Sequence, residues 1–447
     1  MASSAEQMAG QLSLGAFGKA TELKKRLWFT LGALIVYRLG TYIPIPGIDP
    51  AILGDIFEQQ RGGILDVFNL FSGGALERMT IFALNVMPYI SASIIMQLMT
   101  TVSPKLEQLK KEGESGRKKM NQYTRYLTVL LCLVQGYGIA VGLESMTGSV
   151  GSAVIDPGYF FRFTTVVTLL GGTMFLLWLG EQITQRGVGN GISLIIFSGI
   201  VAGFPGALGQ LLEMGRVGTL SPFAIMAILM GGLALIYGIV FMERAQRRLI
   251  VQYPKRQVGN RMFGGENSHL PLKLNTAGVI PPIFASSILL MPATLISFSA
   301  AGGPAWLQDV QFYLGRGQPL YLFLFASAII FFCFFYTAVV FNPADTADNL
   351  KKNGGFVPGI RPGKNTAEYL DYVLTRLTTV GAIYLTIVCL IPEYLITEAN
   401  IPFYLGGTSL LICVTVTMDT VSQIQSHLLA HQYEGLIKKS KLKGRKR

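Results

Sequence analysis

Long uncharged intervals, separated by short blocks of charge, make up most of the 447-residue chain. Three of them, between Arg78 and Lys105, Arg186 and Glu213, and Arg216 and Glu243, each hold 26 uncharged residues. A helix that crosses a bilayer needs about 20 predominantly apolar residues, so each interval is long enough for one span. Further spans are predicted from Leu27 to Ile43 and inside the intervals Arg125–Glu144, Arg162–Glu181, Lys273–Asp309, Arg316–Asp345, Arg376–Glu393 and Glu398–Asp419.

The ten predicted spans fall into two halves of five, divided at residues 206–221. An odd number of helices in each half gives the halves opposite orientations, as in membrane proteins built from inverted repeats. We therefore expect an all-α integral membrane protein with two pseudo-symmetric halves, at 23–205 and 222–427. An N-terminal arm at 1–22 and a basic tail at 428–447 complete this organisation.

A short amphipathic segment stands directly in front of the second predicted span. Residues 66–71 are apolar on one side only and are too few to cross a bilayer. The segment is broken at Ser72, Gly73 and Gly74, a composition that favours a hinge. Taken alone, it is typical of a helix lying in the membrane interface.

Charge content and charge distribution both indicate a membrane protein with a defined orientation. Only 14% of the residues are charged, against about 25% in soluble proteins. If the amino terminus is cytoplasmic, 31 of the 37 basic residues fall on the inward side. The positive-inside rule therefore predicts that both termini are cytoplasmic. This signal accounts for most of the net charge of +12, although the inward loops also suit an RNA-bearing partner such as a ribosome.

The sequence contains no signature of catalytic or metal chemistry. It has no G-x-x-x-x-G-K-[ST], H-E-x-x-H or G-x-S-x-G motif. The glycine-rich Gly187–Gly191 follows no predicted strand and is interpreted as the start of a span. His427 and His431 stand four residues apart without a third ligand nearby, as at a solvated helix end. We therefore predict that the chain is not an enzyme and uses no cofactor or metal.

A small-solute secondary transporter with inverted repeats is the alternative function. Ion-coupled transporters keep ionisable residues at mid-membrane, and the middles of spans two to ten have none. These middles carry uncharged polar residues instead, which either line a pathway or bond one helix to another. They include Asn85, Gln97, Gln135 and Asn275.

Aliphatic stripes and prolines mark several spans. Val86, Ile90 and Ile94 share one helical face, and so do Ile192 and Ile196. Such stripes, taken alone, are typical of lipid-facing surface. Prolines remove a backbone donor, so those inside spans permit kinks and movement of their helices. They are Pro88, Pro281, Pro282 and Pro292.

Two inward loops combine bases with turn residues. The loop 244–273 interleaves basic residues with Leu249, Ile250, Val251 and Tyr253, which alternate as in a short strand. The loop 342–376 places Arg361 between two Pro-Gly corners. The simpler interpretation is that both loops do no more than set the topology and contact lipid head groups. A single Arg held at the tip of a rigid turn is more typical of a docking surface.

Six recognisable segments follow one another along almost the whole chain: FNLFSGGAL, MPYISASII, GVGNGISLIIFSGIVAG, KLNTAGVIPPIFASS, FVPGIRPG and GGTSLLICVTVTMD. Together they resemble bacterial SecY, the channel subunit of the general protein translocon. The resemblance implies two five-helix halves around a central pore with an aliphatic waist. It places that pore ring at Val86, Ile90, Ile192, Ile196, Ile283 and Ile412. Five of these six residues are isoleucine. Val86 is the exception, and it leaves the ring apolar.

The resemblance also implies a plug, a lateral gate and a docking surface. The plug is the short segment at about 63–76, including Phe68, Asn69, Phe71, Ser72, Gly73 and Gly74. The lateral gate, between spans two and three and spans seven and eight, includes Pro88, Ile94, Gln135, Asn275, Pro281 and Pro282. The surface for the SecA motor or a translating ribosome includes Arg247, Arg248, Lys255, Arg256 and Arg361.

The implied function is passage of unfolded secretory polypeptides across the bacterial plasma membrane. Transmembrane segments and signal sequences are expected to leave sideways into lipid through the gate. SecE and SecG are the expected membrane subunits. Energy is expected from the docked motor or ribosome, because the chain has no nucleotide-binding motif of its own.

Overall fold

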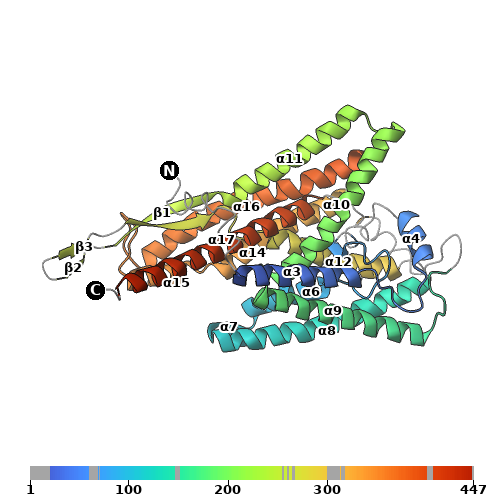
Figure 1. Ribbon diagram of the computed structural model, residues 1–447, viewed down its shortest axis with the longest axis horizontal. Helices are drawn as coiled ribbons and strands as arrows, with labels where there is room; N and C mark the ends of the chain where they lie inside the picture. Colours follow the sequence, from blue (N-terminus) through green and yellow to red (C-terminus); the bar gives the residue numbers. More distant parts are fainter. Residues whose placement is uncertain are drawn as a thin grey trace. The chain divides into compact units, whose positions relative to one another are not determined.

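Helices dominate the structure because a segment inside a bilayer must satisfy its backbone N–H and C=O groups internally. The structure is a computed structural model (Figure 1). It describes residues 21–59, 69, 71–145, 152–253, 256–258, 261–263, 267–299, 313, 318–399 and 406–444. The chain forms two units, the first from Met1–Gly206, Pro292–Gln311 and Val416–Arg447, the second from Ala207–Met291 and Phe312–Thr415. The units therefore divide near the predicted boundary at residue 206 but do not coincide with the two predicted halves.

Within the described residues, the first unit is entirely helical apart from its loops and isolated bridges. Its helices are α3 Thr21–Gly40, α4 Pro50–Gln59, α6 Met87–Val102, α7 Pro104–Lys111, α8 Glu114–Ser145, α9 Tyr159–Arg186 and most of α10 Gly191–Val217. The later part of α17 Gly407–Gly444 also belongs to it. Helix α8 packs against both α6 and α9, and α3 packs against α9.

The second unit combines helices with two small antiparallel sheets. Its helices are α11 Pro222–Arg244, most of α12 Ile280–Ser299, α14 Pro319–Val340, α15 Pro343–Lys352 and α16 Lys364–Ala399. Strand β1 Gln246–Gln252 pairs with β4 Asn267–Lys273, and β2 Arg256–Val258 pairs with β3 Arg261–Phe263. Helix α16 packs against α14 and α15.

Each of the ten predicted spans coincides with a helix in the described chain. Seven of these helices are long and apolar enough to cross a membrane by length and composition. Helices α3, α6 and α12 occupy the other three predicted spans. Helix α6 is short because residues 81–86 form turns and the helix begins only at Met87. The prediction of a helical, multi-span membrane protein is confirmed.

One predicted loop and the predicted tail are largely helical. Helix α10 runs to Val217, so only residues 218–221 of the predicted hinge loop at 206–221 connect it to α11. Helix α11 starts where Ser221 accepts a hydrogen bond from the Ala224 N–H and Pro222 occupies the first turn. The predicted basic tail is also helical as far as Gly444, because α17 continues through it.

Three of the four prolines predicted to lie inside spans stand instead in the first turn of a helix. Pro88 is the second residue of α6, and Pro281 and Pro282 follow directly on Ile280, where α12 begins. The N–H groups of a first turn have no partner within the helix, so proline costs nothing there. Pro292 does lie inside the bounds of α12.

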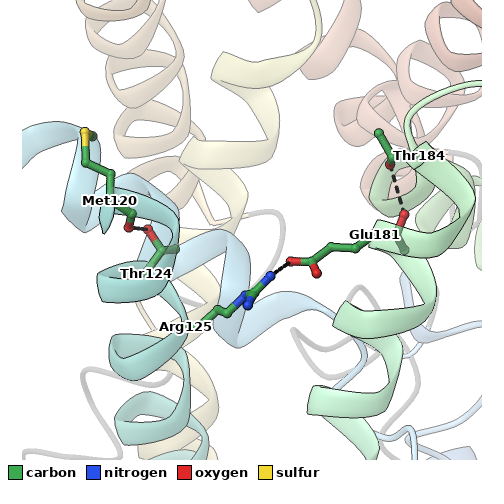
Figure 2. A network of polar contacts seen from close by, with 6 residues as sticks. Met120, Thr124, Arg125, Glu181 and Thr184 are labelled. Carbon is green, nitrogen blue, oxygen red and sulfur yellow. Dashed lines mark hydrogen bonds and ion pairs between the residues drawn. The ribbon is translucent and has the colours of Figure 1, made fainter. Parts of the chain in front are cut away.

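An ion pair joins α8 to α9 in the first unit. Figure 2 shows Arg125 of α8 and Glu181 of α9 reaching toward each other, with Arg125 Nη2 bonded to Glu181 Oε1. Both side chains are partly exposed, so the pair contributes little to stability. Close to each of them, Thr124 donates back to the Met120 carbonyl and Thr184 to the Gly180 carbonyl within their helices.

Candidate channel and docking sites

The residues predicted for the pore ring are partly or fully buried. Exposed fractions are 1% for Val86, 6% for Ile90, 5% for Ile196 and 1% for Ile412. Ile192 and Ile283 are half-buried. The aliphatic stripes are therefore not the lipid-facing surface that their spacing alone suggests. In the first unit, Val86 and Ile90 stand one turn apart where α6 begins, since the Ile90 N–H donates to the Val86 carbonyl.

The segment predicted as the plug ends in a tightly folded turn. Gly73 and Gly74 have φ angles of +66° and +82°, which residues with a side chain rarely adopt. Asn69 holds the turn: its Oδ1 accepts from the Glu77 N–H at 3.0 Å and its Nδ2 donates to Glu77 Oε2 at 3.1 Å. The Ser72 hydroxyl donates to the Asn69 carbonyl at 3.0 Å. Phe68 lies outside the described residues.

Three successive carbonyls of this turn accept hydrogen bonds from side chains elsewhere in the first unit. Asn85 Nδ2 donates to the Phe71 carbonyl at 2.7 Å. The Tyr37 hydroxyl donates to the Ser72 carbonyl at 3.2 Å, and Arg38 Nη1 donates to the Gly73 carbonyl at 3.0 Å. The turn is thus bound through its main chain by α3 and by the residues just before α6.

The turn also packs against α10 at a glycine. A Cβ on Gly199 would lie 2.7 Å from the Phe71 carbonyl oxygen, and one on Gly73 would lie 2.9 Å from the Gly199 Cα. Any side chain at either position would push the two backbones apart. Gly199 follows Ile196 by three residues on α10, so the turn lies within one helical turn of a predicted ring residue.

Sequence reasoning missed Tyr37, Arg38 and Gly199 and left the role of Asn85 open. Asn85 has a φ of +48°, a conformation that Asn adopts more readily than most residues. That backbone, together with full burial, directs its amide to the Phe71 carbonyl. One signal was available: Arg38 is a base near the outer end of a span, away from the inward segments that hold most others.

The residues predicted for the lateral gate are buried side chains in both units. Pro88 and Ile94 are buried on α6, and Gln135 is buried on α8, where its Oε1 has no partner among the described residues. Pro281 and Pro282 are buried at the start of α12. Asn275 Nδ2 donates to Glu243 Oε1 at 2.6 Å and to the Gly278 carbonyl at 3.1 Å. Asn275 therefore ties the end of α11 to the turn before α12.

The two predicted docking loops join into one structure, here called the docking platform, formed by β1, β4 and residues 355–363. Strand β1 pairs with β4 along one edge. Along the other edge, the Gln252 N–H donates to the Phe356 carbonyl at 2.9 Å, and the Gln252 carbonyl accepts from the Phe356 N–H at 3.0 Å. The strand alternation predicted for this loop is confirmed, because Leu249 and Val251 are buried while Arg248 and Ile250 are exposed.

Apolar packing anchors the docking platform on α16. A buried cluster joins the sheet to this helix through Leu249, Leu272, Leu370, Val373, Leu374 and Leu377. Burial of each such side chain contributes about 1.5–3 kcal/mol, so the platform is held firmly within its unit. A platform fixed in this way presents its bases at constant positions.

Arg361 lies exposed at the tip of the docking platform. Gly359 and Gly363 flank it with φ angles of +82° and +110°, and the Thr366 hydroxyl donates to the Arg361 carbonyl at 2.9 Å. These turns fix the backbone on both sides of the guanidinium. Arg247 and Arg248 are exposed on β1, Arg256 is the first residue of β2, and Lys255 lies outside the described residues.

Comparison with known proteins places the chain in a family. Residues 80–421 match the family model described as SecY. The chain is 58% identical over 430 residues to the protein translocase subunit SecY of Escherichia coli K12, covering 96% of this chain and 97% of the relative. It is 59% identical over 436 residues to the same subunit of Pseudomonas aeruginosa PAO1, covering 97% and 98%.

Solved structures support the fold. A structure described as a protein conducting channel matches with a TM-score of 0.65 and 17% identity, covering 91% of this chain and 92% of the other. Another, on the plug domain of SecY, matches with a TM-score of 0.65 and 18% identity over the same shares. At such identities the likeness concerns the fold alone. With its membrane helices and close sequence relatives, the chain belongs to the SecY family, as the non-enzymatic, multi-pass, protein-conducting channel of the Sec translocon in the bacterial plasma membrane.

Proposed function

We propose that the channel is gated by an aliphatic ring and a plug. The ring consists of Val86, Ile90, Ile192, Ile196, Ile283 and Ile412, and the plug is the segment at about 63–76. The observation that carries this proposal is the position of the plug turn in the first unit. It is bonded to Asn85, which directly precedes Val86, and it packs on Gly199, one turn beyond Ile196.

The chemistry of such a ring suits a channel for polypeptides. Aliphatic side chains offer an ion nothing to replace its hydration shell, and a narrow apolar constriction excludes water. They also offer a passing polypeptide no hydrogen bond that would retain it. The ring should therefore block the passage of ions while an extended polypeptide slides through it.

The gate between α6 and α8 on one side and α12 and α14 on the other is proposed as the exit for apolar segments. A signal sequence or transmembrane helix would leave there into lipid. Each side begins with a proline-containing helix start, at Pro88 and at Pro281–Pro282. The buried Gln135 Oε1, without a partner among the described residues, supports a polar role on the α8 side.

The docking platform is proposed as the site of the SecA motor or a translating ribosome, with SecE and SecG as membrane subunits. Its support is the exposed Arg361, held between two glycine turns, in the same platform as the exposed Arg247 and Arg248 of β1. Two further solved structures with the same fold are described as Sec61 in a ribosome-channel complex and a yeast Ssh1 complex bound to a ribosome. Because the chain lacks a nucleotide-binding motif, such a partner must supply the energy.

Both termini and the docking platform are proposed to face the cytoplasm, on the evidence of the basic residues. A cysteine replacing the exposed Lys364 should be protected from an impermeant thiol reagent added outside intact spheroplasts. A cysteine replacing the exposed Asp156, on the opposite side, should react. The four native cysteines are buried and make a low background. Reaction at residue 364 from outside would overturn this orientation and the docking proposal with it.

A further inference from the structure

We propose that Tyr37, Arg38 and Asn85 act as a latch that positions the plug by binding its main chain. This carbonyl latch comprises the three side-chain donors and their acceptors, the carbonyls of Phe71, Ser72 and Gly73. The inference rests on the proposed function, since it takes residues 63–76 as the plug. It adds residues outside the plug, two of them on α3, that hold the resting position.

Tyr37 is placed for this role by packing. Its side chain is fully buried and its ring stacks on Phe82 with centroids 6.1 Å apart. Phe82 in turn stacks on Phe175 of α9. Burial and this stack hold the Tyr37 ring in place, so its hydroxyl is aimed at the Ser72 carbonyl with little further loss of side-chain entropy.

Arg38 supplies the charged donor of the latch. Its Nη1 donates to the Gly73 carbonyl, and its Nη2 donates to the Tyr42 hydroxyl at 3.3 Å. The guanidinium also lies over the Tyr42 ring, 5.5 Å from the centroid. Hydrogen bonds from a charged donor are about twice as strong as neutral ones, so Arg38 should contribute most.

The latch depends on the plug backbone rather than on plug side chains. The left-handed glycines Gly73 and Gly74 and the close approach to Gly199 bring three consecutive carbonyls against their donors. Displacing the turn must break the three bonds together, because the acceptors are three consecutive residues of one turn. The latch should therefore set a threshold for plug release and act as one unit.

Hydrogen exchange of the purified complex in nanodiscs tests the latch directly. The amides of Gly74, Leu76, Glu77 and Thr80 are protected by bonds inside the turn. In Tyr37→Phe these amides should exchange about five- to tenfold faster, since loss of one buried hydrogen bond favours opening by roughly that factor. Arg38→Met should show at least as large an effect, and Arg38→Lys should restore part of the protection.

A matched control removes a hydroxyl elsewhere in the same unit. Tyr126→Phe deletes an exposed hydroxyl on α8 that accepts a bond from Gln122, and it should leave exchange in the turn unchanged. Unchanged exchange of the turn in both Tyr37→Phe and Arg38→Met would overturn the latch. So would faster exchange that extends equally through α8 and α9, because the effect would then be general destabilisation.

Gly199 gives a second route that substitutes none of the three donor residues. Gly199→Ala should push the turn away and speed the same exchange, because its Cβ would lie 2.7 Å from the Phe71 carbonyl oxygen and 3.2 Å from the Tyr37 hydroxyl. Gly206→Ala is the control on the same helix, since a Cβ there meets nothing within 4 Å. Equal exchange in the two variants would contradict the packing on which the latch depends.

Resting ion conductance of the same variants separates this inference from the proposed function. Faster exchange with a raised conductance supports both the latch and the plug. Faster exchange with the parent's conductance leaves the latch standing but overturns the assignment of residues 63–76 as a seal. Unchanged exchange overturns the latch whatever the conductance.

Discussion

Arg361→Glu should abolish motor-driven secretion while leaving the channel folded in the membrane. Reversing a charge at a docked surface costs several kcal/mol, which corresponds to a loss of at least about a hundredfold in binding of the motor. Arg361 is exposed at the tip of a platform fixed by glycine turns and by the Thr366 hydroxyl. The measurement is SecA- and ATP-dependent import of a precursor into proteoliposomes containing the chain with SecE and SecG.

Lys364→Glu is the matched control for that experiment. Lys364 is exposed three residues further along, and its ion pair with Glu368 is long, at 4.0 Å. It undergoes the same change of charge, so general electrostatic repulsion would affect both variants equally. Free energies of unfolding should change by no more than about 0.5 kcal/mol in either variant. Equal import by Arg361→Glu and the parent would contradict the docking role.

Replacing Ile90, Ile192 and Ile283 together by Asn should make the resting channel leak ions. Polar groups wet a constriction that excludes water only while it is apolar and narrow. We expect resting conductance in planar bilayers to rise at least about tenfold, and weaker signal sequences to be accepted.

A channel that lacks Gly63–Leu76 should also leak ions but should still export protein. The deletion combined with the Asn substitutions should leak more than either, because the plug blocks what a weakened ring lets pass.

The control for the ring places the same polar group elsewhere on one of its helices. Val201 is 38% exposed on α10, so Val201→Asn should keep the parent's resting conductance. If the triple variant and the plug deletion are both as ion-tight as the parent, the constriction lies at other residues. A leak from Val201→Asn as large as that of the ring variant would indicate a general loss of packing.

The membrane helices could be predicted because the bilayer imposes a simple rule on sequence. A span must be apolar for about 20 residues, and charges are driven to the ends, so the uncharged intervals located each helix. The helix ends were less predictable, since a helix that leaves the bilayer can continue in water. Helix α10 thus runs on to Val217 and α17 to Gly444, through residues whose sequence pattern predicts loop and tail.

The contacts that hold the plug turn could not be predicted, because they join backbone carbonyls to side chains far away in the sequence. Nothing in the sequence near Tyr37 indicates that its hydroxyl bonds a carbonyl 35 residues on. The fold of the turn itself depends on Gly73 and Gly74, whose angles become known only in the structure. The docking platform was more predictable, because strand alternation and Pro-Gly corners are local signals.

The central claim is that a translocating polypeptide passes through the aliphatic ring. A photo-crosslinking amino acid at Ile90 or Ile283, and at Phe241 as a control that is 64% exposed on α11, tests it with a stalled secretory precursor. The account predicts strong crosslinks to the precursor from residues 90 and 283 and none above background from residue 241. Crosslinks from residue 241 alone, or a protected precursor that reaches neither ring position, would contradict it.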